Sequence, residues 1–189
     1  MGMTWARRRS TGRVLCALTL AFGSSQGAGA QEPPELAVKA AFLYKFGPFV
    51  SWPAESFDSP SSPFSLCIVG DDPFGPMLDG AVANQRVGGR PIVVRRMAKA
   101  DRKAPCQILY AGGSPPNVKD TLQAVAGSPV LTVTDWPAPP GIVAFVMDQG
   151  RVRFRLDDQA AADNGLVISS KLLDLAVSVT ARKIPGAAP

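Results

Sequence analysis

The stretch "FSLCIVGDDPFG", residues 64–75, reads as a short apolar strand that runs into a turn bracketed by two glycines. An apolar run of this length bounded by turn residues is typical of a strand that is buried on both faces of a sheet. In doubly wound α/β proteins, the turn after such a strand holds the phosphates of a nucleotide. The stretch therefore bears on both the fold and a nucleotide site.

Similar short apolar runs, separated by segments of helix length, follow along the chain. We expect strands at residues 64–69, 91–96, 107–112 and 129–135, and helices at 73–83 and 116–126. This alternation predicts a single three-layer α/β domain with a mostly parallel, flavodoxin- or Rossmann-like sheet and flanking helices on both faces. In the flavodoxin-like order, the strand at 64–69 lies between those at 91–96 and 107–112.

The rest of the chain departs from that rhythm. The segment "IVAFVMDQGRVRFRL", residues 142–156, predicts an antiparallel hairpin at the sheet edge. A short helix at 157–164 and a longer one at 169–182 follow, the second with its apolar residues Leu172, Leu173, Leu175, Ala176 and Val179 facing inward. Residues 34–53 predict an amphipathic helix that ends or kinks at Pro48. We expect it to dock on the domain, since its polar face is not basic enough for a membrane surface.

The first 30 residues have the pattern of a signal peptide. A cluster of four arginines precedes the nine-residue apolar run "VLCALTLAF", and "AGA" at 28–30 resembles a cleavage site. The apolar run is much shorter than the roughly 20 residues that span a bilayer. We therefore expect residues 1–30 to be removed, and residues 31–189 to form one exported periplasmic domain that does not insert in the membrane.

Removal of this leader changes the charge of the protein. The whole chain has 20 Lys and Arg against 15 Asp and Glu, and the leader holds four arginines and no acid. The mature chain is left with 16 against 15, a net charge of +1. The composition therefore does not indicate nucleic-acid binding.

Two cysteines, Cys67 and Cys106, remain after cleavage, and the chain has no histidine. In an oxidising compartment, an isolated pair is most simply a disulfide, and adjacent positions in the predicted sheet favour it too. The alternative is a redox-active or nucleophilic cysteine, although a thiolate at Cys67 would be poorly solvated. The missing histidine excludes Ser-His-Asp and Cys-His catalysis and imidazole metal sites. We expect no enzyme activity, no metal and no cofactor.

The turn after residue 69, "GDDPFGPM", lacks the glycine spacing of a dinucleotide fingerprint and has no Gly-Lys-Ser/Thr. Asp71 and Asp72 place negative charge where a phosphate would lie. We expect Asp72 to cap the next helix, with Pro73 at its first position.

Two further loops lie at the carboxyl ends of the predicted parallel strands, where this architecture binds ligands. We consider Gly112 and Gly113, which allow close approach, and Asp135 and Trp136, which offer a charge and an aromatic face, as a ligand crevice. Ordinary turns with a tryptophan packed over the core explain the same residues.

Five blocks of the sequence resemble, in order, the motifs of a known family. They are "VKAAFLYKFGPFVSWP", "LCIVGDDPFG", "CQILYAG", "VLTVTD" and "GLVISSKLLDLA", and they extend from about residue 35 to residue 180. The resemblance is to the YfiR-like group of small periplasmic proteins. It implies a repressor that binds the periplasmic sensory region of an inner-membrane diguanylate cyclase and lowers cyclic-di-GMP synthesis, which controls biofilm formation.

The resemblance also maps a cysteine pair of the family onto Cys67 and Cys106. A second pair found in some members is absent, because residues 143–155 contain no cysteine. A redox switch that depends on that pair is not expected here. The resemblance and the aromatic segment "KFGPFVSW" also favour a homodimer.

We expect an apolar partner-binding surface that includes Phe46, Phe49 and Trp52, although core packing explains these three side chains equally well. The alternative function is a periplasmic sensor that binds a small ligand in the crevice and acts on a different membrane partner.

Overall fold

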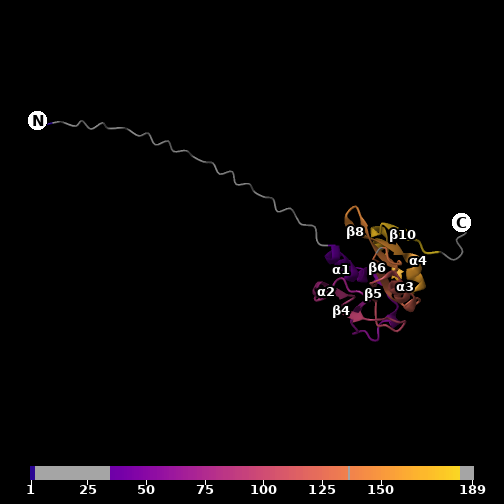
Figure 1. Ribbon diagram of the computed structural model, residues 1–189. Coiled ribbons are helices and arrows are strands. Elements are labelled where there is room, and N and C mark those ends of the chain that lie inside the picture. Colours follow the sequence, from indigo (N-terminus) through magenta and orange to yellow (C-terminus); the bar gives the residue numbers. More distant parts are fainter. Residues whose placement is uncertain (3–34, 136, 184–189) are drawn as a thin grey trace. The chain divides into compact units, whose positions relative to one another are not determined.

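The computed structural model describes residues 1–2, 35–135 and 137–183 (Figure 1). Residues 3–30 of the predicted signal peptide and Trp136 lie outside these residues. From residue 35 on, the described chain forms a mixed α/β domain around an eight-stranded, mostly parallel sheet. The predicted fold class is confirmed.

The strands of this sheet follow one another in the order β10-β8-β7-β6-β5-β2-β4-β3. In that order, their bounds are Ser178–Thr180, Arg151–Asp157, Val143–Asp148, Leu131–Asp135, Ile108–Ala111, Phe64–Val69, Arg90–Met97 and Arg86–Val87. The central strand β2 pairs in parallel with both β4 and β5, and β5 pairs in parallel with β6. This is the order expected from the sequence for the first four strands.

Helices cover both faces of the sheet, as Figure 1 shows for α1 and α2 on one side and α3 on the other. The helices are α1 Glu35–Lys45, α2 Pro76–Val82, α3 Pro115–Ala124, α4 Asp158–Asp163 and α5 Ser170–Leu175. Leu66 and Ile68 of β2 pack in a large core cluster with α1 and α2, whereas Cys67 and Val69 pack in a smaller cluster with α3. The alternation of side chains along one buried strand thus supplies both cores.

A second, two-stranded antiparallel sheet pairs β1, Val50–Ser51, with β9, Val167–Ile168. Two short 3-10 helices, η1 Gly47–Phe49 and η2 Ala54–Ser56, flank β1. The α1 helix therefore ends three residues before Pro48, and η1 contains this proline, as the ring geometry allows at the start of a helical turn.

The predicted hairpin is present as β7 and β8, and the short β10 pairs in parallel with β8 outside it. The long helix expected at 169–182 is wrong in its extent, because α5 ends at Leu175 and the chain continues as a strand. Val177, Val179 and Thr180 are β-branched, and such residues favour a strand. The strand also pairs with β8, whose edge would otherwise be open. Leu175 and Val179, expected to face inward, are 53% and 39% exposed.

Candidate functional site

The turn after β2 is built by the side chain of Asp72. Its Oδ1 accepts hydrogen bonds from the backbone N–H groups of Phe74, at 2.8 Å, and Gly75, at 3.1 Å. The helix α2 begins only at Pro76, so Asp72 and Pro73 do not start it as expected. Asp72 instead closes an Asx-type turn with the N–H groups of Phe74 and Gly75, and Pro76 takes the first helical position.

Arg96 of β4 binds the other side of this turn. Its Nε donates to Asp72 Oδ2 at 2.7 Å, and its guanidinium also pairs with Asp79 of α2 at 2.7 Å. Burial pushes the pKa of Asp72 upward, but the hydrogen bonds from Arg96, Phe74 and Gly75 outweigh it and lower the pKa. The turn thus has its own internal cation, and the N–H groups of Phe74 and Gly75 are already used by Asp72.

A cavity of about 360 Å³ lies at the carboxyl ends of the strands, where the sequence predicts a ligand crevice. Gly112, Gly113 and Asp135 all line it, together with Asp71 and Tyr110. Trp136, the fourth predicted crevice residue, lies outside the described residues. The sequence pattern therefore brought together three residues from the ends of β5 and β6 that do border one cavity.

The close approach that the glycines permit is made by the protein itself. A Cβ atom on Gly70 would lie 2.2 Å from the carbonyl oxygen of Gly112, and a Cβ on Gly112 would lie 2.1 Å from that of Asp71. The loops after β2 and β5 are therefore packed backbone to backbone. Glycine at position 112 is explained by this packing, without a ligand.

A buried lysine that sequence analysis missed lies beside the crevice. Lys39 of α1 is 6% exposed, and its Nζ is 2.7 Å from Asp135 Oδ1 and also pairs with Glu35 one turn earlier in α1. Burial alone would lower the pKa of Lys39, but the hydrogen bonds to Asp135 and Glu35 outweigh it and raise the pKa. The sequence feature that could have predicted this pair is a single lysine within an otherwise apolar face of the helix.

Asp135 also accepts a hydrogen bond from the hydroxyl of Tyr110, at 3.3 Å. Burial, together with the negative charge of Asp135, raises the pKa of Tyr110, so its hydroxyl stays protonated and remains a donor. A second cavity of about 380 Å³ borders Asp135 on the side of Glu35 and Lys39. Asp135 is thus the charge common to both cavities, and Lys39 balances it.

The three predicted partner-binding aromatics differ in their placement. Phe46 is 1% exposed; in the core it stacks on Phe145, with ring centroids 6.0 Å apart, and meets Phe154 edge to face, with centroids 5.2 Å apart. Phe49 and Trp52 are partly buried against the same core, and the Trp52 indole N–H donates to the carbonyl of Gln107 at 3.1 Å. Core packing therefore accounts for Phe46, and only the other two reach the surface.

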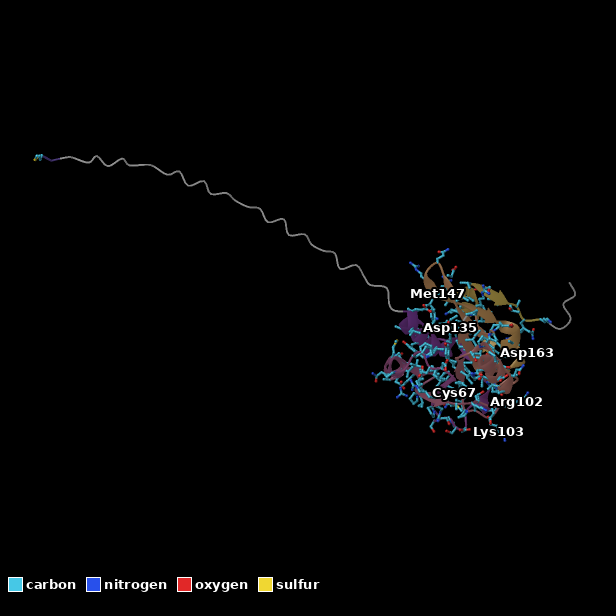
Figure 2. All side chains as sticks on the ribbon, viewed as in Figure 1. Cys67, Arg102, Lys103, Asp135, Met147 and Asp163 are labelled. Atoms are coloured by element: carbon cyan, nitrogen blue, oxygen red, sulfur yellow. A yellow bond between two sulfur atoms is a disulfide. The ribbon has the colours of Figure 1, made fainter. Side chains whose placement is uncertain are left out.

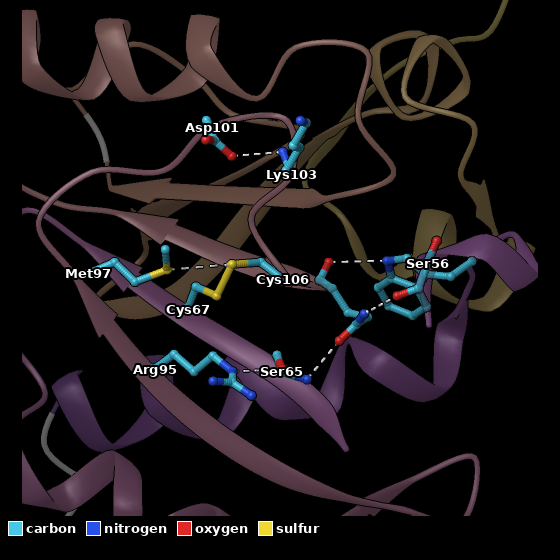
Figure 3. Close-up of a disulfide and its surroundings, with 10 residues drawn as sticks. Ser56, Ser65, Cys67, Arg95, Met97, Asp101, Lys103 and Cys106 are labelled. Carbon is cyan, nitrogen blue, oxygen red and sulfur yellow. Dashed lines mark hydrogen bonds between the residues drawn. A yellow bond between two sulfur atoms is a disulfide. The ribbon is translucent and has the colours of Figure 1, made fainter. Parts of the chain in front are cut away.

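Cys67 and Cys106 form the predicted disulfide, with their Cα atoms 5.8 Å apart (Figure 3). Cys67 lies within β2, and Cys106 lies two residues before β5 begins. Both are buried, at 0% and 4% exposure, in the cluster that packs under α3. The cross-link joins the middle of β2 to the segment that leads into its parallel neighbour β5.

Comparison with known proteins identifies the family. A search of curated proteins finds no match to the chain. A family model described as YfiR/HmsC-like matches residues 36–177, which include every strand of the large sheet except β10. Because this match covers more than half of the chain, the protein belongs to the YfiR/HmsC-like family.

Proposed function

We propose that this protein is a periplasmic regulator that represses an inner-membrane diguanylate cyclase and so lowers cyclic-di-GMP signalling. The observation that carries the proposal is the family match over residues 36–177. The protein acts by binding and not by catalysis, which the absence of histidine from its sequence supports.

Export is part of the same proposal. Residues 1–30 deliver the chain to the periplasm, where the sensory region of the cyclase is accessible. No helix among the described residues is long and apolar enough to cross a membrane. Contact with the cyclase is then made by the surface of the folded domain.

We place the partner-binding surface at the β1–β9 sheet and its flanks. Val167 of β9 is 54% exposed and pairs with Ser51 of β1, between the partly buried Phe49 and Trp52. We propose the exposed valine and the parts of Phe49 and Trp52 that reach the surface as its apolar centre, since such side chains dominate binding energy in protein interfaces. The buried Phe46 is not part of this surface.

Repression requires that the protein bind the inactive conformation of the cyclase more tightly than the active one, since equal affinity shifts no equilibrium. Deletion of the gene should therefore raise cellular cyclic-di-GMP and surface attachment. Re-expression with the leader should reverse both, and a copy without residues 1–30 should not. Unchanged cyclic-di-GMP in the deletion strain would contradict the repressor role.

A matched pair of variants tests the surface. Val167→Asp places a charge on the proposed surface at an exposed position, so it should release repression without unfolding the protein. Val93→Asp is the control, because Val93 is 37% exposed on β4, in the other sheet. Release of repression by both variants alike would exclude the β1–β9 surface.

The crevice favours a second candidate function, that of a sensor for a small ligand. The cavity of about 360 Å³ that Gly112, Gly113 and Asp135 line is large enough for a small metabolite. A thermal-shift screen of small metabolites tests this function, with Asp135→Asn as the variant that should lose the stabilisation by any ligand found. Such a ligand, together with unchanged cyclic-di-GMP in the deletion strain, would favour the sensor over the repressor.

We also propose a homodimer. The described residues include exposed apolar side chains at Leu175, Val177 and Val179, next to the open edge of β10. Such edges promote association with another chain. Light scattering should show twice the mass of about 17 kDa that the mature length implies, and a monomer at micromolar concentration would exclude the dimer.

A further inference from the structure

A third cavity lies at the amino ends of the parallel strands, whereas the crevice lies at their carboxyl ends. Its volume is about 300 Å³, and it is lined by the segments that precede β2, β5 and β6. Figure 2 shows Arg102 and Lys103, two of its lining residues, toward the other end of the domain from Asp135. The family signature and the predicted crevice do not account for this cavity.

Three cations border the cavity: Arg95, Arg102 and Lys103. Within residues 35–135 and 137–183, none of the three has a carboxylate within ion-pair distance, in contrast to Arg96, Arg182 and Lys39. Arg95 is held in place, because its Nε donates to Ser65 Oγ at 3.1 Å (Figure 3). The cavity thus has one oriented guanidinium and two further positive charges beside it.

The floor of the cavity is polar and fixed. Gln107 is 3% exposed; its Oε1 accepts from the backbone N–H of Ser65 at 2.7 Å, and its Nε2 donates to the carbonyl of Ser56 at 2.6 Å. The hydroxyl of Ser56 is buried and has no hydrogen-bond partner among the described residues. Buried polar atoms are rarely left unpaired, so this hydroxyl adds hydrogen-bonding capacity beside Gln107 that the described residues do not use.

Two carboxylates, Glu55 and Asp58, also line the cavity, so its net charge is one positive. Both are exposed to solvent, and neither pairs with the three cations in the described chain. They limit how strongly the cavity attracts anions, so we expect one oxyanion of the ligand, and not several, to meet the three cations. The volume fits a small metabolite and is at the lower limit for ligand pockets.

We propose that this cavity binds a small organic anion through one terminal carboxylate or phosphate group, with Arg95, Arg102 and Lys103 as the binding cations. Arginine recognises both oxyanions by paired hydrogen bonds, so the same site accepts either. The proposal does not depend on the membrane partner. Cys106, the less completely buried of the two cysteines, lines the cavity, so an occupant lies beside the disulfide.

Calorimetric titration of the purified protein with succinate and with glycerol 3-phosphate tests the site, with glycerol as the uncharged control. Arg102→Gln/Lys103→Gln should weaken binding by about tenfold or more, and Glu55→Gln should tighten it. Lys99→Gln is the matched control, since Lys99 is an exposed cation four residues from Lys103 and does not line this cavity. Binding of succinate alone assigns a carboxylate ligand, and binding of glycerol 3-phosphate alone assigns a phosphate ester.

The disulfide supplies a second readout. Saturating anion should slow the reduction of Cys67–Cys106 by the neutral reagent dithiothreitol in the wild-type protein and in Lys99→Gln, but not in the double variant. Binding of neither probe at millimolar concentration, or an equal loss of affinity in Lys99→Gln, would overturn the proposal.

Discussion

At the scale of single residues, two links join parts of the chain that are distant in sequence. The disulfide spans 39 positions between Cys67 and Cys106, and the bond from Lys39 to Asp135 spans 96. The first is covalent, and the second neutralises a lysine that is buried under α1. Each link predicts a measurable change in stability.

Replacement of either cysteine, as Cys67→Ser or Cys106→Ser, should lower the free energy of unfolding by about 2 to 4 kcal/mol. The cross-link restricts the unfolded chain, and the serine hydroxyl would be buried in an apolar cluster. Urea unfolding of both variants measures the loss, and the reduced wild-type protein is the control. Two reactive thiols in the unreduced wild-type protein would contradict the disulfide.

Replacement of the buried lysine by an apolar residue, Lys39→Met, should lower the free energy of unfolding by about 1 to 3 kcal/mol at neutral pH, because Asp135 loses its cation. Since folding raises the pKa of Lys39, its contribution is complete below the ordinary lysine value of 10.5 and is lost as the pH rises through the folded pKa. The difference between wild type and variant should therefore shrink in strong base.

Lys39→Met/Asp135→Asn provides the control for that change. It should be more stable than Lys39→Met alone, since no unpaired carboxylate remains. An equal loss in the single and the double variant would show that Lys39 contributes packing and not charge.

At the scale of elements, β2 and the segment 169–182 show what local sequence can predict. The apolar run of β2 can be buried on both faces only between two parallel neighbours, so its pattern was sufficient to predict both the strand and its place in the sheet. The segment 169–182 has helical periodicity as far as Leu175, but beyond it the chain pairs with β8. That choice depends on an open edge 20 or more residues away, which no local pattern contains.

The same limit applies to the sites. Gly112, Gly113 and Asp135 were predicted together because parallel strands bring their carboxyl ends to one edge. The basic cavity was not predicted, because Arg95, Arg102 and Lys103 reach it from unlike segments with no shared motif. The start of α2 shifted from Pro73 to Pro76 because Asp72 is used by the turn and by Arg96.

Replacing valine by alanine near β10 should change stability in one direction if the segment is a strand and in the other if it is a helix. Val177→Ala/Val179→Ala should lower the free energy of unfolding by less than about 1 kcal/mol, because alanine is a poorer strand residue and both valines are partly exposed. In a helix that continued to residue 182, the same change would raise stability. Thermal unfolding distinguishes the two, and a stabilised double variant would contradict β10.

At the scale of the whole molecule, the first helix depends on the second half of the chain. Phe42 and Phe46 of the α1 segment pack against Phe145 of β7 and Phe154 of β8, and Lys39 pairs with Asp135. These contacts involve separations of about one hundred residues. The two halves of the sequence therefore do not form separate folding units.

A fragment of residues 31–141, which lacks β7 and β8, should accordingly fail to fold. It retains the disulfide and strands β2 to β6, but the aromatic cluster of α1 has lost its partners. Circular dichroism and limited proteolysis should show a loosely structured chain. A protease-resistant fragment with cooperative unfolding would contradict this expectation.

The packing of α1 against the hairpin also sets an order in time. A ribosome makes α1 among the first elements of the domain, yet the aromatic part of its apolar face lacks Phe154, its partner in β8, until residue 154 exists. Throughout synthesis of the intervening hundred or so residues, that face is open to aggregation or to a chaperone. The helix that is made first is therefore the one that waits longest to be buried.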